Sequence, residues 1–211
     1  MRLVAHVFLT ADGVMQGPGS PGEDTSGGFD RGGWMPPYAD ADSARIVDDW
    51  YRGAEAVLLG RGTFELFRGY WPNVTDPDDL IATSLNTLPK YVASTTLGDP
   101  AWTGTTVLGG DVLGGVLDLL RRPGGELQVH GSRRLTRSLH RAGLIDEYRF
   151  LVFPVTIGSG TRLFGPGDPA VGLRLQEATR TAAGAVHLRY TPDEHRAGAF
   201  GIDGGLRTSE I

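Results

Sequence analysis

The stretch LQVHGSRRLTRSL, residues 127–139, decides the fold class because its apolar period changes partway along. Leu127 and Val129 alternate as in a half-buried strand, whereas Leu135 and Leu139 recur at the spacing of one helix face. The stretch therefore predicts a strand that passes directly into a helix, which is the repeating step of an α/β sheet.

The predicted helix opens with two arginines, Arg133 and Arg134. A helix N-terminus already carries about +0.5 of an elementary charge, so acidic residues are favoured there and cations are not. An anion bound over Gly131 and Ser132 would neutralise the two arginines and would explain why they are tolerated there. The alternative is that each arginine bends into solvent, which costs only about 0.3 to 1 kcal/mol per charge.

A second strand-to-helix step repeats this pattern in AVLLGRGTFELF, residues 56–67. The apolar run passes through Gly60 into a helix whose first turn carries Arg61 and Thr63. Open α/β sheets bind ligands at the carboxyl ends of their strands, where both steps lie. Two arginine-headed helices at such positions favour an anionic, phosphate-bearing ligand over two unrelated surface charges.

Periodicity and chain-breaking residues extend the alternation of strands and helices along most of the chain. The predicted strands lie near residues 2–9, 55–60, 90–95, 105–108, 126–131, 147–155, 173–179 and 185–191. The predicted helices cover residues 41–53, 62–69, 111–122 and 132–142. Because the last three strands follow one another without a helix, we expect a mixed, mostly parallel sheet with helices on both faces and an antiparallel part.

The composition favours one domain that acts on a small molecule. The 211 residues are 40% hydrophobic and 21% charged, and a formal net charge of −5 gives no general attraction to nucleic acid or to anionic membranes. The absence of cysteine excludes disulfides, thiolate metal sites and a cysteine nucleophile. The five histidines show no metal-ligand spacing, so no metal site is expected. With neither a signal-peptide pattern nor an apolar run of membrane-spanning length, we expect a cytoplasmic protein.

Residues 17–33 form a glycine-rich segment, GPGSPGEDTSGGFDRGG, that is too polar for a core and too long for a simple connection. Its first six residues match the spelling of a dinucleotide-binding fingerprint. Pro18 and Pro21, however, lack the amide donors that a phosphate cradle uses, and no helix follows them. We therefore predict a mobile loop, or lid, at this position.

Five segments, in this order, carry a resemblance to a known family: LTADGVMQGPG, LLGRGTFE, LPKYVASTTL, VHGSRRL and GLIDEYRFLVFPVTIGSGTRLFG. Residues 1–192 resemble the dihydrofolate reductase superfamily, in particular the branch related to the reductase domain of the bifunctional riboflavin-biosynthesis deaminase-reductase. The resemblance implies a dihydrofolate-reductase-like three-layer fold with a mixed eight-stranded sheet. It also implies NADPH as the hydride donor and a homodimer.

The resemblance further implies roles for residues at the predicted strand ends. Arg61 and Thr63 would hold the 2′-phosphate and a diphosphate oxygen, Ser94 and Thr95 would lie at the adenosine phosphate, and Met15 would lie near the nicotinamide. The remaining implied cofactor-binding residues are Gly60, Gly131, Ser132, Arg133, Arg134 and Leu135. The family's paired glycine is here a glycine followed by a serine.

Two acids are candidate proton donors. Asp12 follows an apolar strand in ADGV, where the DG pair is equally an ordinary turn signature. The resemblance places the matching acid beside the substrate. Asp42 lies at the start of a predicted helix, where Asp48 and Asp49 compete with it and all three also fit a solvated face.

Together these residues predict an NADPH-dependent oxidoreductase that transfers a hydride to a C=N or C=O bond of a pterin-, pyrimidine- or sugar-derived small molecule. Trp34 and Tyr38 are candidates for the walls of its substrate pocket, or for core. The alternatives are a nucleotide-binding module of the same fold without turnover and a flavin-binding reductase. Residues 193–211 show little apolar periodicity and form either a disordered tail or an arm that docks on the partner subunit of a homodimer.

Overall fold

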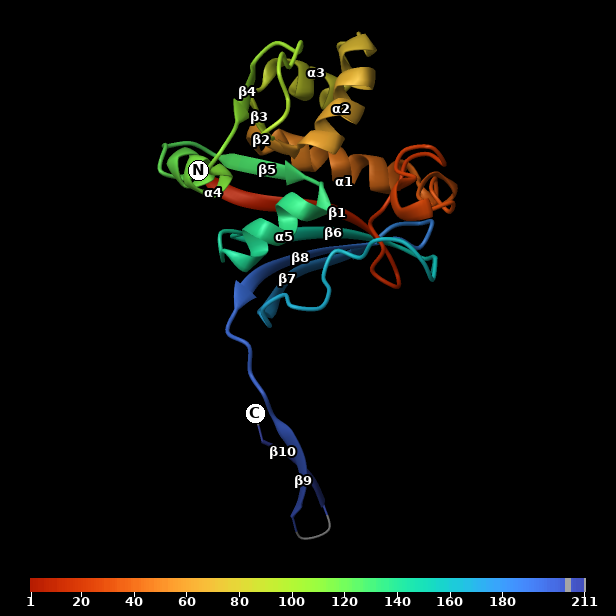
Figure 1. Cartoon of the computed structure of the whole chain (residues 1–211). Coiled ribbons are helices and arrows are strands. Elements are labelled where there is room, and N and C mark those ends of the chain that lie inside the picture. The colour runs from red at the N-terminus through yellow and green to blue at the C-terminus, as the bar shows by residue number, and fades with distance from the viewer. Residues whose placement is uncertain (204–205, 211) are drawn as a thin grey trace.

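The computed structural model describes residues 1–203 and 206–210, with side chains up to residue 200. An eight-stranded sheet crosses the body, and its strand order is β4-β3-β2-β5-β1-β6-β8-β7 (Figure 1). The strands are β1 (Arg2–Thr10), β2 (Ala54–Gly60), β3 (Lys90–Ala93), β4 (Thr105–Leu108), β5 (Glu126–His130), β6 (Glu147–Phe153), β7 (Gly172–Arg180) and β8 (Val186–Asp193).

The strand directions confirm the predicted mixed, mostly parallel sheet. Neighbours from β4 through β6 all pair in parallel, whereas β8 is antiparallel to both β6 and β7. The antiparallel part arises because β8 returns between β6 and β7. The parallel pairing brings the carboxyl ends of β2 and β5 to the same edge of the sheet, where the two arginine-headed helices begin.

Helices cover both faces of the sheet, as the alternating pattern predicted. They are α1 (Ala41–Arg52), α2 (Arg61–Tyr70), α3 (Leu80–Thr87), α4 (Val112–Leu120) and α5 (Arg133–Arg141). On one face Leu3 and Ala5 of β1 pack with Val116 of α4 and Leu139 of α5. On the other face, residues of β2 and β3 form a core with side chains of α1, α2 and α3.

Helix α3 was missed by the sequence analysis. It has only eight residues, and its side chains lack a clear amphipathic period, so the segment resembled a loop. Its beginning is nevertheless marked, because the side chain of Asp79 accepts a hydrogen bond from the Ala82 amide at 2.8 Å. Leu85 is fully buried against the sheet, which shows that packing stabilises the helix.

A layer of buried histidines lies between the sheet and α1. His6 of β1 lies 4.7 Å from the rings of both Trp50 and His130, and the Trp50 indole donates to Nε2 of His187 at 3.1 Å. Within the described residues, neither ring nitrogen of His6 has a hydrogen-bond partner. Burial lowers the pKa of all three histidines, that of His130 to about 3. The layer is therefore held in its neutral form.

The C-terminal segment forms a hairpin of β9 (Ala199–Asp203) and β10 (Leu206–Glu210), which are antiparallel. Figure 1 shows that this hairpin projects away from the body of the molecule. Residues 199–203 and 206–210 therefore have a defined strand pairing, and the docking of the tail on a partner subunit stays a prediction. In the described part of the chain, no helix has the length and hydropathy to cross a membrane.

Candidate active site

Two helices begin at the same edge of the sheet, each directly after a parallel strand. Helix α2 begins at Arg61, immediately after β2, and helix α5 begins at Arg133, with two residues between it and the end of β5. Their N-cap residues are Gly60 and Ser132, and neither makes a side-chain capping hydrogen bond within the described chain. The first amide groups of both helices are thus available to an anion.

The other three α-helices are capped differently. Asp40, Asp79 and Asp111 each accept a hydrogen bond from a first-turn amide of α1, α3 and α4. A carboxylate is the expected partner for the positive end of a helix dipole. Among the α-helices of the described chain, only α2 and α5 begin with arginine in place of a carboxylate cap, which favours an external anion at both positions.

The two helix N-termini contact each other. A Cβ built on Gly60 would overlap Oγ of Ser132 and lie 3.0 Å from its Cβ, so a side chain at residue 60 would displace Ser132. Gly131 has a φ of 61°, and a Cβ there would lie 3.3 Å from Oγ1 of Thr63. The peptide bond between Gly131 and Ser132 is cis. The predicted residues of the two steps therefore form one continuous surface.

Arg61 lies across the carboxyl end of β3. Its Nε donates to Oε1 of Glu65 at 2.8 Å, and its NH1 donates to the hydroxyl of Thr96. The Ser94 hydroxyl accepts hydrogen bonds from the amides of Thr96 and Leu97 and is 8% exposed, so it shapes the turn after β3. The neighbouring Thr95 is exposed, and of the two predicted hydroxyls it is the freer to meet a ligand.

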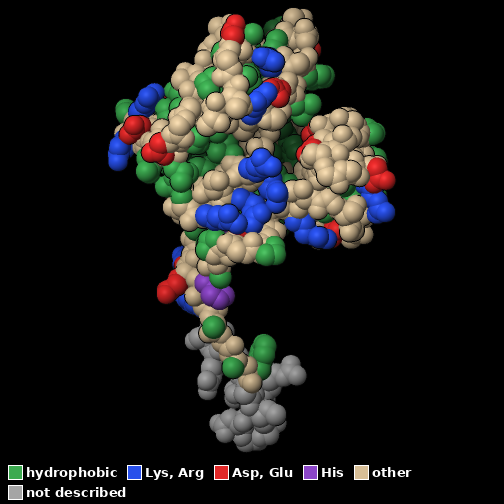
Figure 2. All heavy atoms as spheres, in the orientation of Figure 1, with side chains coloured by type: hydrophobic (Ala, Val, Ile, Leu, Met, Phe, Trp, Pro, Cys, Tyr) green, Lys and Arg blue, Asp and Glu red, His purple; other side chains and the backbone are tan. Residues whose placement is uncertain are grey.

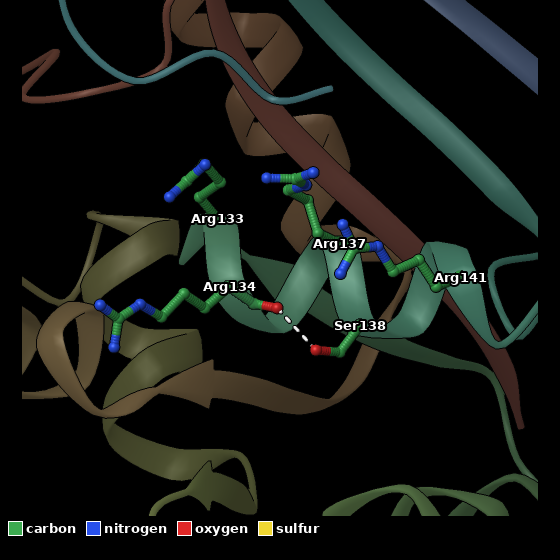
Figure 3. A pocket seen from close by; sticks show the side chains of 5 residues that line it. All are labelled: Arg133, Arg134, Arg137, Ser138 and Arg141. Atoms are coloured by element: carbon green, nitrogen blue, oxygen red, sulfur yellow. Dashed lines mark hydrogen bonds between the residues drawn. The ribbon is translucent and has the colours of Figure 1, made fainter. Parts of the chain in front are cut away.

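A hollow of about 250 Å³ lies on the exposed side of α5 (Figure 3). It continues from the N-terminus of the helix along its length. Ser138 in the hollow donates to the carbonyl oxygen of Arg134 at 2.9 Å. The lining residues are Arg133, Arg134, Arg137, Ser138 and Arg141. Four arginines lining one hollow favour an anionic ligand, because each guanidinium group can donate to anionic oxygens.

Asp168 holds two of these arginines in place. Its carboxylate accepts from Arg137 at 2.9 Å and from Arg141 at 2.8 Å, and its side chain is only 5% exposed. The hydrogen bond from Arg137 keeps the pKa of Asp168 far below its usual value, so the acid stays ionised. For Arg133 and Arg134, by contrast, the described residues provide no ion pair. Figure 2 shows the resulting basic patch over α5.

Arg137, Arg141 and Asp168 were not predicted from the sequence. The first two could have been found, because with Arg133 they recur at every fourth residue and so lie on one side of the helix. Asp168 lies on the connection between β6 and β7, and nothing in its local sequence indicates that it returns to α5. The residue also anchors this connection, since Oδ2 accepts from the Gly165 amide at 2.8 Å.

Two predicted cofactor residues are more buried than a ligand contact requires. Leu135 is 6% exposed and packs in the core beneath α5, so only its first-turn amide remains for an anion. Met15 is half-buried against the same core, and its amide donates to the Thr161 carbonyl at 2.9 Å. Both side chains therefore pack in the core beside the site.

Asp12 has a structural role that differs from the predicted proton donor. Its carboxylate accepts hydrogen bonds from the Thr10 hydroxyl at 2.6 Å, the Ile157 amide at 3.1 Å and the Gly158 amide at 2.9 Å, and it pairs with Arg162. The Thr10 hydrogen bond is the main cause that lowers the pKa of Asp12 to about 2. An acid that is ionised at neutral pH and bound by four donors is a poor proton donor.

We expect Asp12→Ala to free the segment after β6. The amides of Ile157 and Gly158 lose their acceptor, so their hydrogen exchange is expected to accelerate about ten-fold or more, as loss of about 1.4 kcal/mol of local protection would give. Amide exchange measured by NMR checks this. Asp118→Ala, which removes an exposed partner of Arg121, is the matched control. Unchanged exchange at both amides would rule out this role for Asp12.

Asp42 is also engaged elsewhere. It forms an ion pair with Arg45 on its own helix, and its Oδ2 accepts from the Ala182 amide at 2.9 Å. The neighbouring Asp40 accepts from the Ala183 amide at 2.6 Å. These contacts join the start of α1 to the turn between β7 and β8. The prediction that Asp42 donates a proton therefore lacks support from its geometry.

Trp34 and Tyr38 belong to an aromatic cluster beside α1. Trp34 is 4% exposed, and its indole donates to the Gln16 carbonyl at 2.8 Å. Tyr38 is half-buried and packs against the same cluster, which also contains Phe8 and Phe153. Both predicted residues thus form the packed base of the glycine-rich loop. Phe8 is a further half-buried aromatic side chain in this cluster. The apolar pattern of its strand did not indicate that it lies beside the predicted pocket residues.

Gln16 organises the glycine-rich loop. Its side-chain amide donates to the Ser26 carbonyl at 2.9 Å, and its Oε1 accepts from the Thr161 amide at 3.0 Å. Phe29 is 6% exposed and further anchors the loop against the same cluster. The loop therefore folds over the aromatic side chains, and its motion as a lid stays a prediction. In the described chain, no group of three or more acidic, histidine or cysteine residues could hold a metal ion.

Comparison with known proteins agrees with this geometry. The family model of the RibD C-terminal domain matches residues 2–187. The chain belongs to this family. The uncharacterised protein YyaP of Bacillus subtilis (strain 168) is 26% identical over 191 residues, which are 90% of this chain and 94% of YyaP.

Solved structures of low sequence identity share the fold of this RibD C-terminal domain protein. A pyrimidine reductase-like protein from Corynebacterium diphtheriae matches with a TM-score of 0.65 at 15% identity, over 92% of each chain. Dihydrofolate reductase from Enterococcus faecalis, complexed with NADP(H), matches with a TM-score of 0.58 at 14% identity, over 92% of this chain and 97% of that one. The α/β fold predicted from the sequence is confirmed, and the family is reductase-like.

Proposed function

We propose that this protein is an NADPH-dependent reductase of a small molecule. The observation that carries the proposal is the pair of uncapped, arginine-headed helices, α2 and α5, whose N-termini contact each other through Gly60 and Ser132. A dinucleotide carries several phosphates a few ångströms apart, and two adjoining helix N-termini match that arrangement.

The residues at this edge fit NADPH. The free amides at the start of α5, with Arg133 and Arg134, would hold the diphosphate, and Thr63 would contact one of its oxygens. Arg61 and Thr95, at the ends of β2 and β3, would hold the 2′-phosphate. The absence of side chains at Gly60 and Gly131 leaves the backbone open to close approach. NADPH, when bound, supplies a hydride from its nicotinamide ring.

The chain itself would bind and orient the coenzyme and the substrate, and it would exclude water from the site. The aromatic cluster around Trp34 and Phe8 would exclude water beside the end of β1, where the substrate would lie. Because Asp12 and Asp42 are both engaged, we expect the proton to come from solvent water rather than from either carboxylate. The proposed substrate carries a C=N or C=O bond in a pterin-, pyrimidine- or sugar-derived molecule.

Two measurements test the proposal in sequence. Fluorescence titration is expected to show saturable NADPH binding. A screen of pterin, pyrimidine and sugar-derived compounds is then expected to yield one that accelerates the loss of reduced-nicotinamide absorbance. Absence of NADPH binding would overturn the proposal.

A nucleotide-binding module without turnover is the second candidate. It is favoured by one observation, namely that both predicted proton donors are engaged in structural hydrogen bonds. NADPH binding without oxidation in the presence of any compound in the screen would favour this candidate.

Arg61→Ala is expected to weaken NADPH binding by about ten- to a hundred-fold and to leave NADH binding nearly unchanged. A charge-assisted hydrogen bond to a phosphate contributes about 1.5 to 3 kcal/mol, and only NADPH carries the 2′-phosphate. Calorimetric titration with both coenzymes measures the difference. Arg121→Ala, on the exposed surface of the chain after α4, is the matched control. Equal losses for the two coenzymes would refute the assignment of Arg61.

A further inference from the structure

The basic hollow on α5 extends beyond the part that the proposed function uses. Its end residues, Arg133 and Arg141, are eight residues apart in the sequence, which is about 12 Å along the helix axis. The proposed function assigns only the first turn of α5, with Arg133 and Arg134, to the diphosphate of the coenzyme. The hollow continues from there along the helix to Arg137 and Arg141 (Figure 3). This outer part has no ligand in the proposed function.

One carboxylate oxygen holds the two outer arginines side by side. Oδ1 of Asp168 accepts from Nε and NH2 of Arg137, at 3.1 and 2.9 Å, and from Nε of Arg141 at 2.8 Å. NH2 of Arg137 also donates to the Pro166 carbonyl at 3.3 Å. Both guanidinium groups are therefore fixed before any ligand arrives, and little side-chain entropy would be lost on binding.

Donors and positive charge remain on these groups. Within the described residues, NH1 of Arg137 and both terminal nitrogens of Arg141 make no hydrogen bond, and the Arg141 side chain is 49% exposed. Asp168 is the only carboxylate that the described chain pairs with the four arginines of the hollow, so a surplus of three positive charges remains. The surplus is local, because the formal net charge of the whole chain is −5.

The lining of the hollow fits a row of phosphate groups. Arg133, Arg137 and Arg141 recur at every fourth residue and follow one side of the helix (Figure 3). The small side chain of Ser138 lies beside them, and its hydroxyl is turned to the helix by its hydrogen bond to the Arg134 carbonyl. In the described chain, no aromatic or acidic residue lines the hollow. Its recognition chemistry is therefore that of guanidinium groups, which bind phosphate oxygens in bidentate fashion.

We propose that α5 binds a chain of three or more linked phosphate groups along its arginines, from Arg133 to Arg141. Inorganic polyphosphate and the phosphate tail of a nucleoside triphosphate share this chemistry. Such a chain occupies the first turn of α5, where the diphosphate of NADPH is proposed to bind, so the two ligands exclude each other. The mutual exclusion rests on the proposed function, whereas the binding of polyphosphate does not.

Calorimetric titration with inorganic tripolyphosphate, without NADPH or magnesium and at low ionic strength, tests the site. The wild type is expected to bind one tripolyphosphate per chain with a dissociation constant on the order of ten micromolar, and orthophosphate at least about ten-fold more weakly. Titration with ATP distinguishes the sources: a similar affinity extends the site to nucleotides, and binding of tripolyphosphate alone restricts it to inorganic chains. No heat with tripolyphosphate, or equal affinity for orthophosphate, overturns the proposal.

Arg141→Ala is expected to weaken tripolyphosphate binding about ten-fold and to leave NADPH binding nearly unchanged. The substitution removes the end of the hollow that lies farthest from the first turn, and Asp168 keeps its hydrogen bonds from Arg137. An Arg137→Gln/Arg141→Ala double variant is expected to lose more affinity, and circular dichroism checks that both variants fold. Arg174→Ala, which removes another exposed arginine paired with an aspartate, Asp193, is the matched control. Wild-type affinity for tripolyphosphate in both variants overturns the assignment to α5.

Competition between the two ligands separates this proposal from the proposed function. At ten times its dissociation constant, tripolyphosphate is expected to raise the apparent dissociation constant of NADPH about ten-fold in the wild type, and less in Arg141→Ala at the same concentration. If tripolyphosphate binds and NADPH does not, the proposed function fails and the polyphosphate site stands. If both bind and tripolyphosphate leaves the affinity for NADPH unchanged, the mutual exclusion is overturned.

Discussion

The free energy of unfolding is expected to fall as the pH is lowered from 6.5 to 5, and the slope approaches about 1.4 kcal/mol per pH unit for each buried histidine that stays neutral in the folded state. His6, His130 and His187 are buried in their neutral form, and burial lowers the pKa of each in the folded state. In the unfolded chain the same side chains titrate near 6.5, so the unfolded state binds more protons in this range. His130, whose pKa is lowered to about 3, contributes this full slope, and His6 and His187 add to it in the same direction.

The charged groups around the layer do not reverse this sign. Arg149 lowers the pKa of all three histidines, and Arg189 also lowers that of His187. Glu177 and Glu147 raise the pKa of His187, but burial is the larger effect. Stability is therefore greatest above pH 6.5 and is lost on acidification.

Urea unfolding at several pH values measures this slope. His6→Leu removes one titrating group and is expected to reduce the slope by up to about 1.4 kcal/mol per pH unit. It should cost little at pH 7.5, because the His6 ring nitrogens make no hydrogen bond with the described residues. His195→Gln, at an exposed histidine, is the matched control and should keep the wild-type slope. A wild-type stability that stays flat between pH 6.5 and 5 would disprove the neutral layer.

Gly60→Ala is expected to weaken NADPH binding about a hundred-fold. The new Cβ would overlap the side chain of Ser132, and Ser132 is the N-cap of α5. The N-termini of α2 and α5 would move apart, and a ligand that bridges them would lose its fit to one of the two. Displacements of about 1 Å in a preorganised site can cost this much.

A second substitution separates the loss of affinity caused by the clash with Ser132 from a general loss of folded structure. Ser132→Gly removes the atoms that the new Cβ meets, so the Gly60→Ala/Ser132→Gly double variant is expected to recover most of the affinity. Gly62→Ala, in the first turn of the same helix, meets no atom within 4 Å and is the matched control. Titration of the wild type, the two single variants and the double variant with NADPH gives a complete cycle. If Gly60→Ala binds NADPH as the wild type does, the contact between the two helices is irrelevant to binding.

The sequence predicts most of the sheet because its strands are apolar or alternating runs, and several of them are bounded by glycine or followed by an amphipathic helix. The strand-to-helix steps after residues 60 and 131 are the clearest, since a change of apolar period marks each. Helix α3 was not predicted, because its eight residues have no clear amphipathic stripe and so show no helical period. The return of β8 between β6 and β7 depends on the path of a long connection, and local sequence does not encode that path.

The residues of the candidate site also divide into those that the sequence predicts and those that it does not. Residues on the two helix starts were predictable because arginine at a helix N-terminus is unfavourable without an anion. The roles of Asp12 and Asp42 were not predictable, because their partners Gly158 and Ala182 lie about 140 residues away in the sequence. Only the fold brings those backbone amides to the carboxylates and shows that both acids are engaged.

Calorimetric titration of NADPH into the wild-type chain and into an Arg133→Ala/Arg134→Ala double variant tests most directly whether the paired helix N-termini form a dinucleotide site. The wild type is expected to bind one NADPH per chain with a dissociation constant on the order of micromolar, and the double variant at least about a hundred-fold more weakly. Wild-type titrations without heat, or equal affinities for the two proteins, would contradict this assignment.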